Sequence, residues 1–159
     1  MINVLFVCLG NICRSTMAEG IFSQMIADSG LNKFINCDSA GISAYHLGED
    51  PDHRTLEILL KHGTKLTHKG RQLNANDLDY FDYILAMDVN NYNDITLLAK
   101  SHQKDHSHVI MMRNFDSVKD SQNVPDPYWS MLDGFEEVYQ ILYRSNTEFL
   151  KFLRKKRNI

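Results

Sequence analysis

The sequence predicts an α/β protein with a four-stranded parallel sheet, doubly wound, with helices on both faces. Short apolar runs rich in β-forming residues alternate with segments that have helical periodicity. The first run, residues 2–7, has almost no polar residue, as expected for a strand buried on both faces. No internal repeat or low-complexity linker interrupts this pattern. The 159 residues are therefore expected to form one domain, 1–159.

The elements can be placed in chain order. Strands are expected at residues 2–7, 34–38, 83–87 and 109–112, and helices at 15 to about 30, 52–61, 89–100 and 134–157. Pro51 and Gly63 bracket the second helix, and the last helix has a continuous apolar stripe. Residues 77–82 are expected to form a turn. In such a sheet a ligand site lies at the carboxyl ends of the strands.

Composition excludes several classes of function. Apolar residues make up 43% and charged residues 23% of the chain, as in an ordinary globular protein. The net charge of -3 argues against a nucleic-acid partner, and no run is apolar and long enough to cross a membrane. The three cysteines and the seven scattered histidines have no zinc-site spacing, so we expect no metal and no cofactor.

Cysteine usage also bears on location. An odd, low cysteine count without a signal peptide is typical of a reducing compartment. A cytoplasmic location is therefore expected, and export without a signal peptide in a bacterium stays open.

The most informative segment connects the first strand to the first helix. Cys8 and Arg14 enclose five residues, and Ser15 follows. At a helix N-terminus the backbone N–H groups are unpaired and the dipole is positive, so an anion is favoured. Gly10 and Asn11 are residue types that readily adopt positive φ, which lets N–H groups turn inward as an anion-binding nest.

The residue types in this loop suit chemistry on a phosphate ester. A thiol beside a helix N-terminus and an arginine is readily deprotonated, which makes Cys8 a candidate nucleophile. Arg14 offers a planar fork of donors to two phosphate oxygens. Ser15 could donate to the thiolate or to the sulfur as it leaves. The alternative is a structural buried cysteine beside a surface arginine, but the combination of residues and their spacing favours a catalytic loop.

This loop resembles the phosphate-binding loop of the low-molecular-weight protein tyrosine phosphatases. Similar segments recur along the chain at residues 38–41, 45–48, 51–52, 62–63, 81–88 and 126–128. The resemblance implies the phosphotyrosine phosphatase I-like fold and hydrolysis of phosphotyrosine monoesters in proteins through a cysteinyl-phosphate, without a metal. It also implies a phosphate site formed by Leu9, Gly10, Asn11, Ile12, Cys13 and Arg14.

An acid is needed to protonate the departing phenolate. Asp126 is the candidate, because Pro125 and Pro127 stiffen its loop and restrict the direction of its carboxyl group. By itself an Asp-Pro pair is usually a turn. Its match to the family's Asp-Pro-Tyr loop makes Asp126 the predicted general acid and base.

Aromatic residues are expected to form the substrate walls. Tyr128 and Trp129 follow the acid, and Tyr45 matches the family's aromatic residue on the opposite wall. The alternative is that they belong to the core; for Tyr128 and Trp129 the surrounding prolines favour exposure. Relatives that act on phosphoarginine tend to have threonine where this chain has Ile12, so Ile12 favours phosphotyrosine.

Supporting roles are implied by the resemblance. His68 is expected to hold Asn11, with Ser39 in the same network; the alternative is an ordinary surface histidine. Asp88 could orient His68 or cap the next helix. Cys13 could form a reversible disulfide with Cys8 or simply fill the loop, and both interpretations stay open.

Two rival functions fit the sequence less well. An arsenate reductase of the same fold needs two further cysteines late in the chain, and none follows Cys37. A non-catalytic phosphotyrosine-binding module would not need the complete set of Cys8, Arg14 and Asp126. The expected partner is a phosphotyrosine-containing protein, and the chain is expected to be a monomer or to self-associate weakly.

Overall fold

The computed structural model describes all 159 residues and has the predicted parallel sheet. Its four strands are β1 (Ile2–Cys8), β2 (Ile35–Gly41), β3 (Tyr83–Ala86) and β4 (Val109–Met111). They lie in the order β2-β1-β3-β4, and every neighbouring pair is parallel. The α/β prediction is therefore confirmed.

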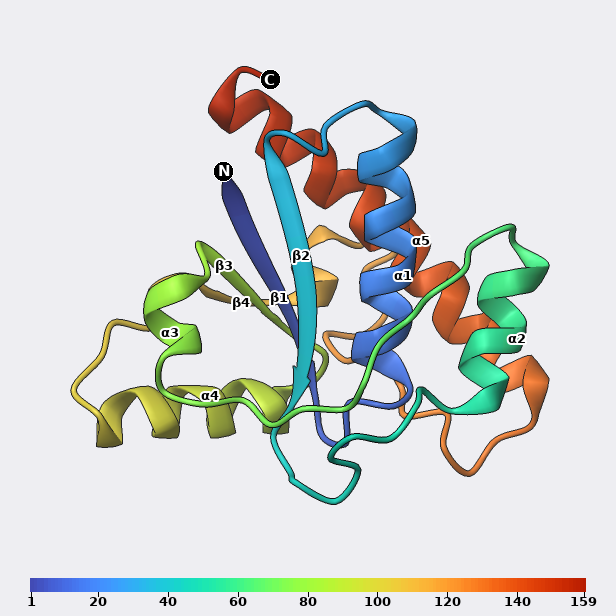
Figure 1. Ribbon diagram of the computed structural model, residues 1–159, viewed down its shortest axis with the longest axis horizontal. Helices are drawn as coiled ribbons and strands as arrows, with labels where there is room; N and C mark the ends of the chain where they lie inside the picture. Colours follow the sequence, from blue (N-terminus) through green and yellow to red (C-terminus); the bar gives the residue numbers. More distant parts are fainter.

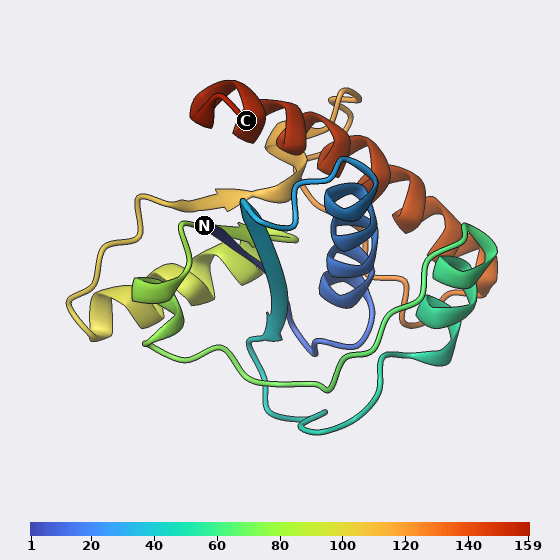
Figure 2. The same ribbon diagram turned by 45° about the horizontal axis from the view of Figure 1, so that its top comes forward.

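Helices cover both faces of the sheet (Figures 1 and 2). Helices α1 (Arg14–Asp28) and α5 (Leu132–Arg157) lie on one face, with α2 (His53–Lys61) beside α5. Helices α3 (Asp77–Tyr80) and α4 (Val89–Ser101) lie on the other. None of the helices combines the length and the apolar character that a membrane span needs.

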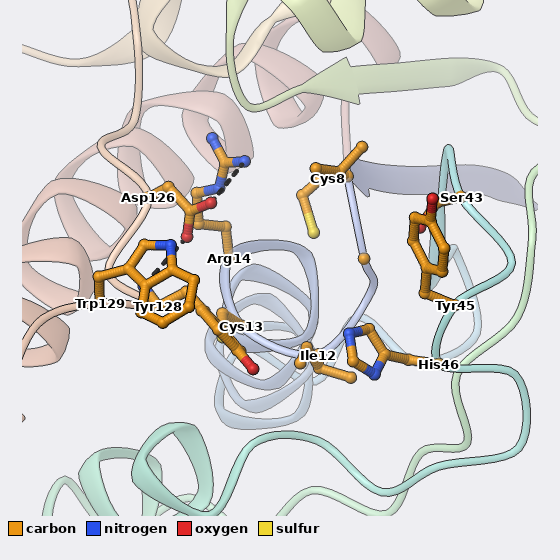
Figure 3. Close-up of a pocket in the computed structure, with 12 residues that line it drawn as sticks. Cys8, Ile12, Cys13, Arg14, Ser43, Tyr45, His46, Asp126, Tyr128 and Trp129 are labelled. Carbon is orange, nitrogen blue, oxygen red and sulfur yellow. Dashed lines mark hydrogen bonds and ion pairs between the residues drawn. The ribbon is translucent and has the colours of Figure 1, made fainter.

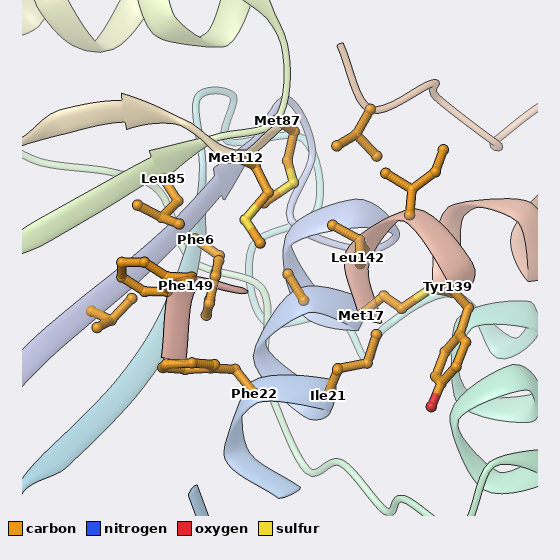
Figure 4. Close-up of a cluster of buried hydrophobic side chains, with 14 of the residues drawn as sticks. Phe6, Met17, Ile21, Phe22, Leu85, Met87, Met112, Tyr139, Leu142 and Phe149 are labelled. Atoms are coloured by element: carbon orange, nitrogen blue, oxygen red, sulfur yellow. The ribbon is translucent and has the colours of Figure 1, made fainter. Parts of the chain in front are cut away.

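Strand β1 connects the two apolar cores of the molecule. Val4 and Phe6 belong to the larger core. Figure 4 shows Phe6 between the sheet and helices α1 and α5. Leu5 and Val7 point to the opposite face, into the smaller core against α4. All four side chains are fully buried. This two-sided burial explains the almost continuous apolar run in the sequence.

Several element boundaries differ from the prediction. Strand β2 extends to Gly41, because Ser39, Ala40 and Gly41 pair with the last three residues of β1. Residues predicted as a turn contain α3, in which the Asp77 carboxylate accepts the N–H of Asn74 at 2.9 Å. Strand β4 ends one residue early at a 3-10 helix, η1 (Met112–Phe115).

The strand order determines where a ligand can bind. The chain passes from β1 through α1 to β2 on one side, and from β3 through α4 to β4 on the other side. The order therefore reverses between β1 and β3, and in such sheets the crevice beyond the carboxyl ends at this point is the usual ligand site. The loop after β1 begins there.

Candidate active site

The loop between β1 and α1 is a cup of backbone N–H groups. Asn11 has φ of 57°, as its residue type suggested. Gly10 does not have positive φ, so that expectation was wrong. A Cβ there would lie 3.1 Å from Cδ2 of His46, whose side chain would have to shift. The N–H groups of Gly10, Ile12 and Cys13 donate to no backbone carbonyl. These donors are available to an anion at the N-terminus of α1.

The Asn11 side chain holds the loop in this conformation. Its Nδ2 donates to Oγ of Ser15 at 2.9 Å and to Oγ of Ser39 at 3.0 Å. Its Oδ1 accepts from Nε2 of His68 at 2.8 Å and from the N–H of Arg71 at 3.0 Å. All four hydrogen-bonding positions of the amide are thus used, which offsets the cost of positive φ in a non-glycine residue.

The sulfur of Cys8 receives hydrogen bonds from inside the cup. The N–H of Asn11 lies 3.3 Å from Sγ, and Oγ of Ser15 lies 3.0 Å from it. Because Ser15 already accepts from Asn11, its own hydrogen is free to point toward the sulfur. Two donors directed at one sulfur suit a thiolate.

Arg14, the first residue of α1, is buried beside this sulfur with 4% of its side chain exposed. Its Nη1 donates to Oδ2 of Asp88 at 2.7 Å and to the carbonyl of Val124 at 3.1 Å. Burial alone would lower the pKa of the guanidinium, but the negative charge at Cys8 and the Asp88 carboxylate raise it. Arg14 is therefore a fixed cation at the base of the pocket.

The sequence left two roles open for Asp88, to orient His68 or to cap the next helix, and the structure shows the capping role. Its Oδ1 accepts the N–H of Asn91 at 2.7 Å, which caps α4. Its other oxygen binds Arg14, and it makes no hydrogen bond to His68. Asp88 thereby links the start of α4 to the phosphate loop.

His68 is buried rather than a surface histidine. Its Nδ1 lies 3.1 Å from Oε2 of Glu19 and 3.8 Å from Oδ1 of Asp38. Glu19 also accepts the hydroxyl of Ser39 at 2.5 Å. Glu19, Asp38 and His68 are close enough together to hold a metal ion. In this structure Arg71 already neutralises Asp38, with Nε at 2.9 Å from Oδ2. The cluster instead supports Asn11, through the hydrogen bonds that His68 and Ser39 make to its side chain.

The loop that carries Asp126 is anchored at both ends. The N–H of Val124 donates to the carbonyl of Met87 at 2.8 Å, which fixes the beginning. Nη1 of Arg54, in α2, donates to the carbonyl of Ser130 at 2.8 Å, which fixes the end. Asp126 itself is half-exposed.

Cys8, Arg14 and Asp126 share one pocket of about 270 Å³ (Figure 3). Oδ2 of Asp126 lies 3.8 Å from Nη2 of Arg14. Figure 3 shows the Cys8 sulfur turned into the space that these side chains surround. Residues 118 positions apart in the chain thus meet at one cavity.

The predicted wall residues also line this pocket. Tyr45 and Trp129 project into solvent with 85% and 92% exposure, and Tyr128 is partly exposed, so the expectation of exposure for Tyr128 and Trp129 is confirmed. Ile12 is buried and also lines the pocket. Leu9, with an exposed side chain, and the previously unidentified Ser43 and His46 complete the lining.

Cys13 lies in the same pocket as Cys8, and both are free thiols. Burial, followed by the nearby Asp52 carboxylate and the charge at Cys8, raises the pKa of the Cys13 thiol. Cys13 is therefore a neutral thiol beside the predicted nucleophile.

Sequence reasoning missed Glu19, Arg54 and Arg71. Each acts through a contact with a residue far away in the chain, and none belongs to a short motif. Arg71 had the clearest signal, because it lies only three residues after His68, for which the resemblance implies a supporting role.

Comparison with known proteins identifies the family. The family model described as low molecular weight phosphotyrosine protein phosphatase matches residues 3–159. The low molecular weight protein-tyrosine-phosphatase YfkJ of Bacillus subtilis is 41% identical over 160 residues, covering 100% of both chains. The human low molecular weight phosphotyrosine protein phosphatase is 36% identical over 149 residues, covering 94% of both chains.

Solved structures agree with this assignment. The crystal structure of YfkJ superposes with a TM-score of 0.92 at 42% identity, over 98% of this chain and 96% of that one. The Drosophila arginine phosphatase DARP superposes with a TM-score of 0.90 at 33% identity, over 95% and 97% of the two chains. The chain therefore belongs to the low molecular weight phosphotyrosine protein phosphatase family, and it is a phosphatase.

Proposed function

We propose that this phosphatase hydrolyses phosphotyrosine monoesters in proteins through a cysteinyl-phosphate, with Cys8 as nucleophile, Arg14 as phosphate clamp and Asp126 as general acid and base. One observation carries the proposal: a sulfur that receives two hydrogen bonds, a buried guanidinium and a carboxyl group face the same cavity. These are the three groups that phosphoryl transfer to a thiol requires.

In the first step the Cys8 thiolate attacks phosphorus from the floor of the pocket. The S–P bond forms while the P–O bond to the phenol breaks, and the carboxyl proton of Asp126 passes to the leaving oxygen. The N–H groups of Gly10, Ile12 and Cys13 and the guanidinium of Arg14 bind the equatorial oxygens and stabilise their developing charge. Ser15 and the N–H of Asn11 keep the sulfur directed at phosphorus.

In the second step water replaces the sulfur. The Asp126 carboxylate takes a proton from water as the new O–P bond forms and the S–P bond breaks. The leaving sulfur is stabilised by the hydroxyl of Ser15. The products are phosphate and the free thiolate, and the residues of the loop supply the charge stabilisation without a cofactor.

The walls support phosphotyrosine as the substrate. Tyr45 on one side, with Tyr128 and Trp129 on the other, can hold a phenyl ring between them. The short side chain of phosphoserine would leave these aromatic residues without a partner. DARP, a structural relative, is named an arginine phosphatase, so the identity of residue 12 matters: isoleucine favours the aromatic ester.

The partner would be a phosphotyrosine-containing protein. The net charge of -3 argues against a nucleic-acid partner. We further propose that the chain acts in the cytoplasm, because its thiols are free and its nucleophile requires a reducing environment. We also propose that it is a monomer or a weakly associating species.

The acid assignment is tested with leaving groups of different basicity. Asp126→Ala should lower kcat/KM by about 10²–10⁴-fold for phenyl phosphate, and by less for p-nitrophenyl phosphate, whose leaving group needs little protonation. Equal losses on both substrates would contradict a general acid at position 126.

The substrate class is tested by turnover of matched peptides that contain phosphotyrosine, phosphoserine or phosphoarginine. Phosphotyrosine should be preferred, and Cys8→Ser should abolish turnover without lowering the melting temperature. If the phosphoarginine peptide were turned over as fast as the phosphotyrosine peptide, Ile12 would not select for phosphotyrosine. Persistent activity in Cys8→Ser would overturn the mechanism.

A further inference from the structure

The segment that leads into the acid loop lacks apolar packing of its own. Residues 117–123, between η1 and Val124, are all exposed. The one apolar side chain among them, that of Val118, is 42% exposed. A loop with so little apolar burial is not ordered by the hydrophobic effect. Other interactions must hold it where it enters the active site.

The guanidinium of Arg113 supplies those interactions. Only 3% of this side chain is exposed. Its Nη1 donates to the carbonyl of Asn123 at 3.0 Å and its Nη2 to the carbonyl of Val118 at 3.4 Å. Nη2 also forms an ion pair with Asp120. The loop therefore folds around one buried cation and is bound to it near both ends.

A buried carboxylate balances this cation. Asp116 is fully buried and accepts from Nε of Arg113 at 3.1 Å. On its other side it accepts from Nε and Nη2 of Arg144, in α5, at 2.9 and 3.1 Å, and from the N–H of Val118 at 3.0 Å. Burial alone would raise the pKa of Asp116, but these donors lower it, so the carboxylate stays charged. A paired and fully bonded cluster of this kind is rigid.

The cluster connects directly to the catalytic groups. Asn123, which Arg113 holds by its carbonyl, also accepts the N–H of Val89 through its side chain at 3.0 Å. Val124 follows, and its carbonyl accepts from Arg14. Asp126 lies two residues later. Arg113 thus fixes the point from which the acid is directed into the pocket.

We propose that Arg113 is a positioning residue that places the Asp126 carboxyl group over the substrate. The inference rests on the proposed role of Asp126. Arg113 does not line the pocket and touches none of the reacting groups. Its effect on the reaction therefore passes through the backbone of residues 123–126.

The geometry requires a guanidinium. The two carbonyls and the two carboxylates lie in different directions around Arg113, and a planar fork of five donors can reach all of them. A lysine keeps the charge but offers one compact ammonium group. Arg113→Lys should retain the pairing with Asp116 and lose the bond to Asn123.

The test measures kcat/KM of Arg113→Lys for phenyl phosphate and p-nitrophenyl phosphate. A displaced acid should cost about tenfold with phenyl phosphate, since small misplacements of a catalytic group have effects of this order, and less than about threefold with p-nitrophenyl phosphate. Arg144→Lys is the matched control, because Arg144 binds the same carboxylate but no carbonyl of the loop. Arg144→Lys should lower the melting temperature without changing the ratio of the kcat/KM values for the two substrates.

A double-mutant cycle isolates the route of the effect. In an Asp126→Ala background, Arg113→Lys should cause no further loss of kcat/KM with phenyl phosphate, because the group that it positions is gone. Additive losses, or equal losses on both substrates in the single variant, would show that Arg113 has a structural role only and would overturn the inference.

Two outcomes separate this inference from the proposed function. If Asp126→Ala shows no dependence on the leaving group, the acid assignment fails. If Asp126→Ala shows this dependence and Arg113→Lys does not, the inference alone fails.

A second variant serves if Arg113→Lys does not fold. Arg113→Met combined with Asp116→Asn removes both buried charges together, a replacement that proteins often tolerate. The ratio of the kcat/KM values for phenyl phosphate and p-nitrophenyl phosphate then tests the inference in the same way.

Discussion

Asn11 shows how much one residue contributes at this site. Its backbone has φ of 57° and its N–H faces the Cys8 sulfur, while its side chain makes four hydrogen bonds beneath the loop. The side chain and the backbone therefore perform different tasks. Ser39, His68 and Arg71, which bond to this amide, do not line the substrate pocket, so they act by fixing the shape of the cup.

Two substitutions separate these tasks. Asn11→Gly keeps access to positive φ but loses the side-chain bonds, whereas Asn11→Ala loses both. We expect both variants to have lower kcat, and Asn11→Ala to be less stable than Asn11→Gly by about 1 kcal/mol, the usual cost of this conformation for alanine. Thermal denaturation and steady-state kinetics measure the two effects. Equal stability of the two variants would show that the backbone is not strained.

Cys13 allows a second test at the scale of a residue. It is a buried, neutral thiol in the pocket of Cys8. If the two form a disulfide, inactivation by peroxide should be reversed by dithiothreitol in the parent protein and should become largely irreversible in Cys13→Ser. If Cys13→Ser regained full activity after dithiothreitol, no protective disulfide would be needed, and Cys13 would only fill space in the loop.

At the scale of elements, the end of β2 supports the loop between β1 and α1. Gly41 pairs with Cys8, and the loop crosses directly above it. A Cβ at position 41 would lie 3.0 Å from the carbonyl oxygen of Leu9 and 3.1 Å from the nitrogen of Asn11. Both neighbours are backbone atoms, which cannot move without changing the cup.

Gly41→Ala should therefore impair phosphate binding. We expect the inhibition constant of inorganic phosphate to rise by about tenfold and the stability to fall by about 1–3 kcal/mol, as for other overpacked sites. Competitive inhibition assays and thermal denaturation provide the two values. An unchanged inhibition constant would mean that the strand and the loop can separate at little cost.

At the scale of the molecule, ion pairs that each contain one buried residue connect segments that the sheet does not join. Arg14 and Asp88 connect α1 to α4, and Arg144 and Asp116 connect α5 to the segment after η1. The pKa of Asp116 is lowered in the folded protein despite its burial, because of the donors around it. Its stabilising effect is fully present above the unfolded-state pKa of about 3.9 and is lost as the pH falls through the lower folded value.

Asp116→Asn should show this dependence on pH. The variant should melt well below the parent at pH 7, where the carboxylate is charged in both states. The difference in melting temperature should narrow below about pH 4, as the parent loses the same interaction. Melting curves between pH 2.5 and 7 measure it, and a constant difference over this range would rule out Asp116 as a source of acid sensitivity.

Much of this protein follows from local sequence. The parallel sheet was predictable because β1 is apolar on both faces and because helical periodicity returns after each strand. The phosphate cup was predictable because Cys8, Asn11 and Arg14 are close together in the chain and the helix N-terminus supplies the rest. Asp126, the proposed acid, stood out in the sequence by its motif, and the structure places it in the same pocket as Cys8.

What the tertiary structure decided is which distant groups meet. Arg14 binds a carbonyl 110 residues away, and Asn11 depends on His68 and Arg71, which are 57 and 60 residues away. The role of Arg113 appears only once its guanidinium is seen to face two carbonyls of an exposed loop. Periodicity and turn chemistry are properties of neighbouring residues and can be read from the sequence, whereas these contacts depend on strand order and packing, which bring remote segments together.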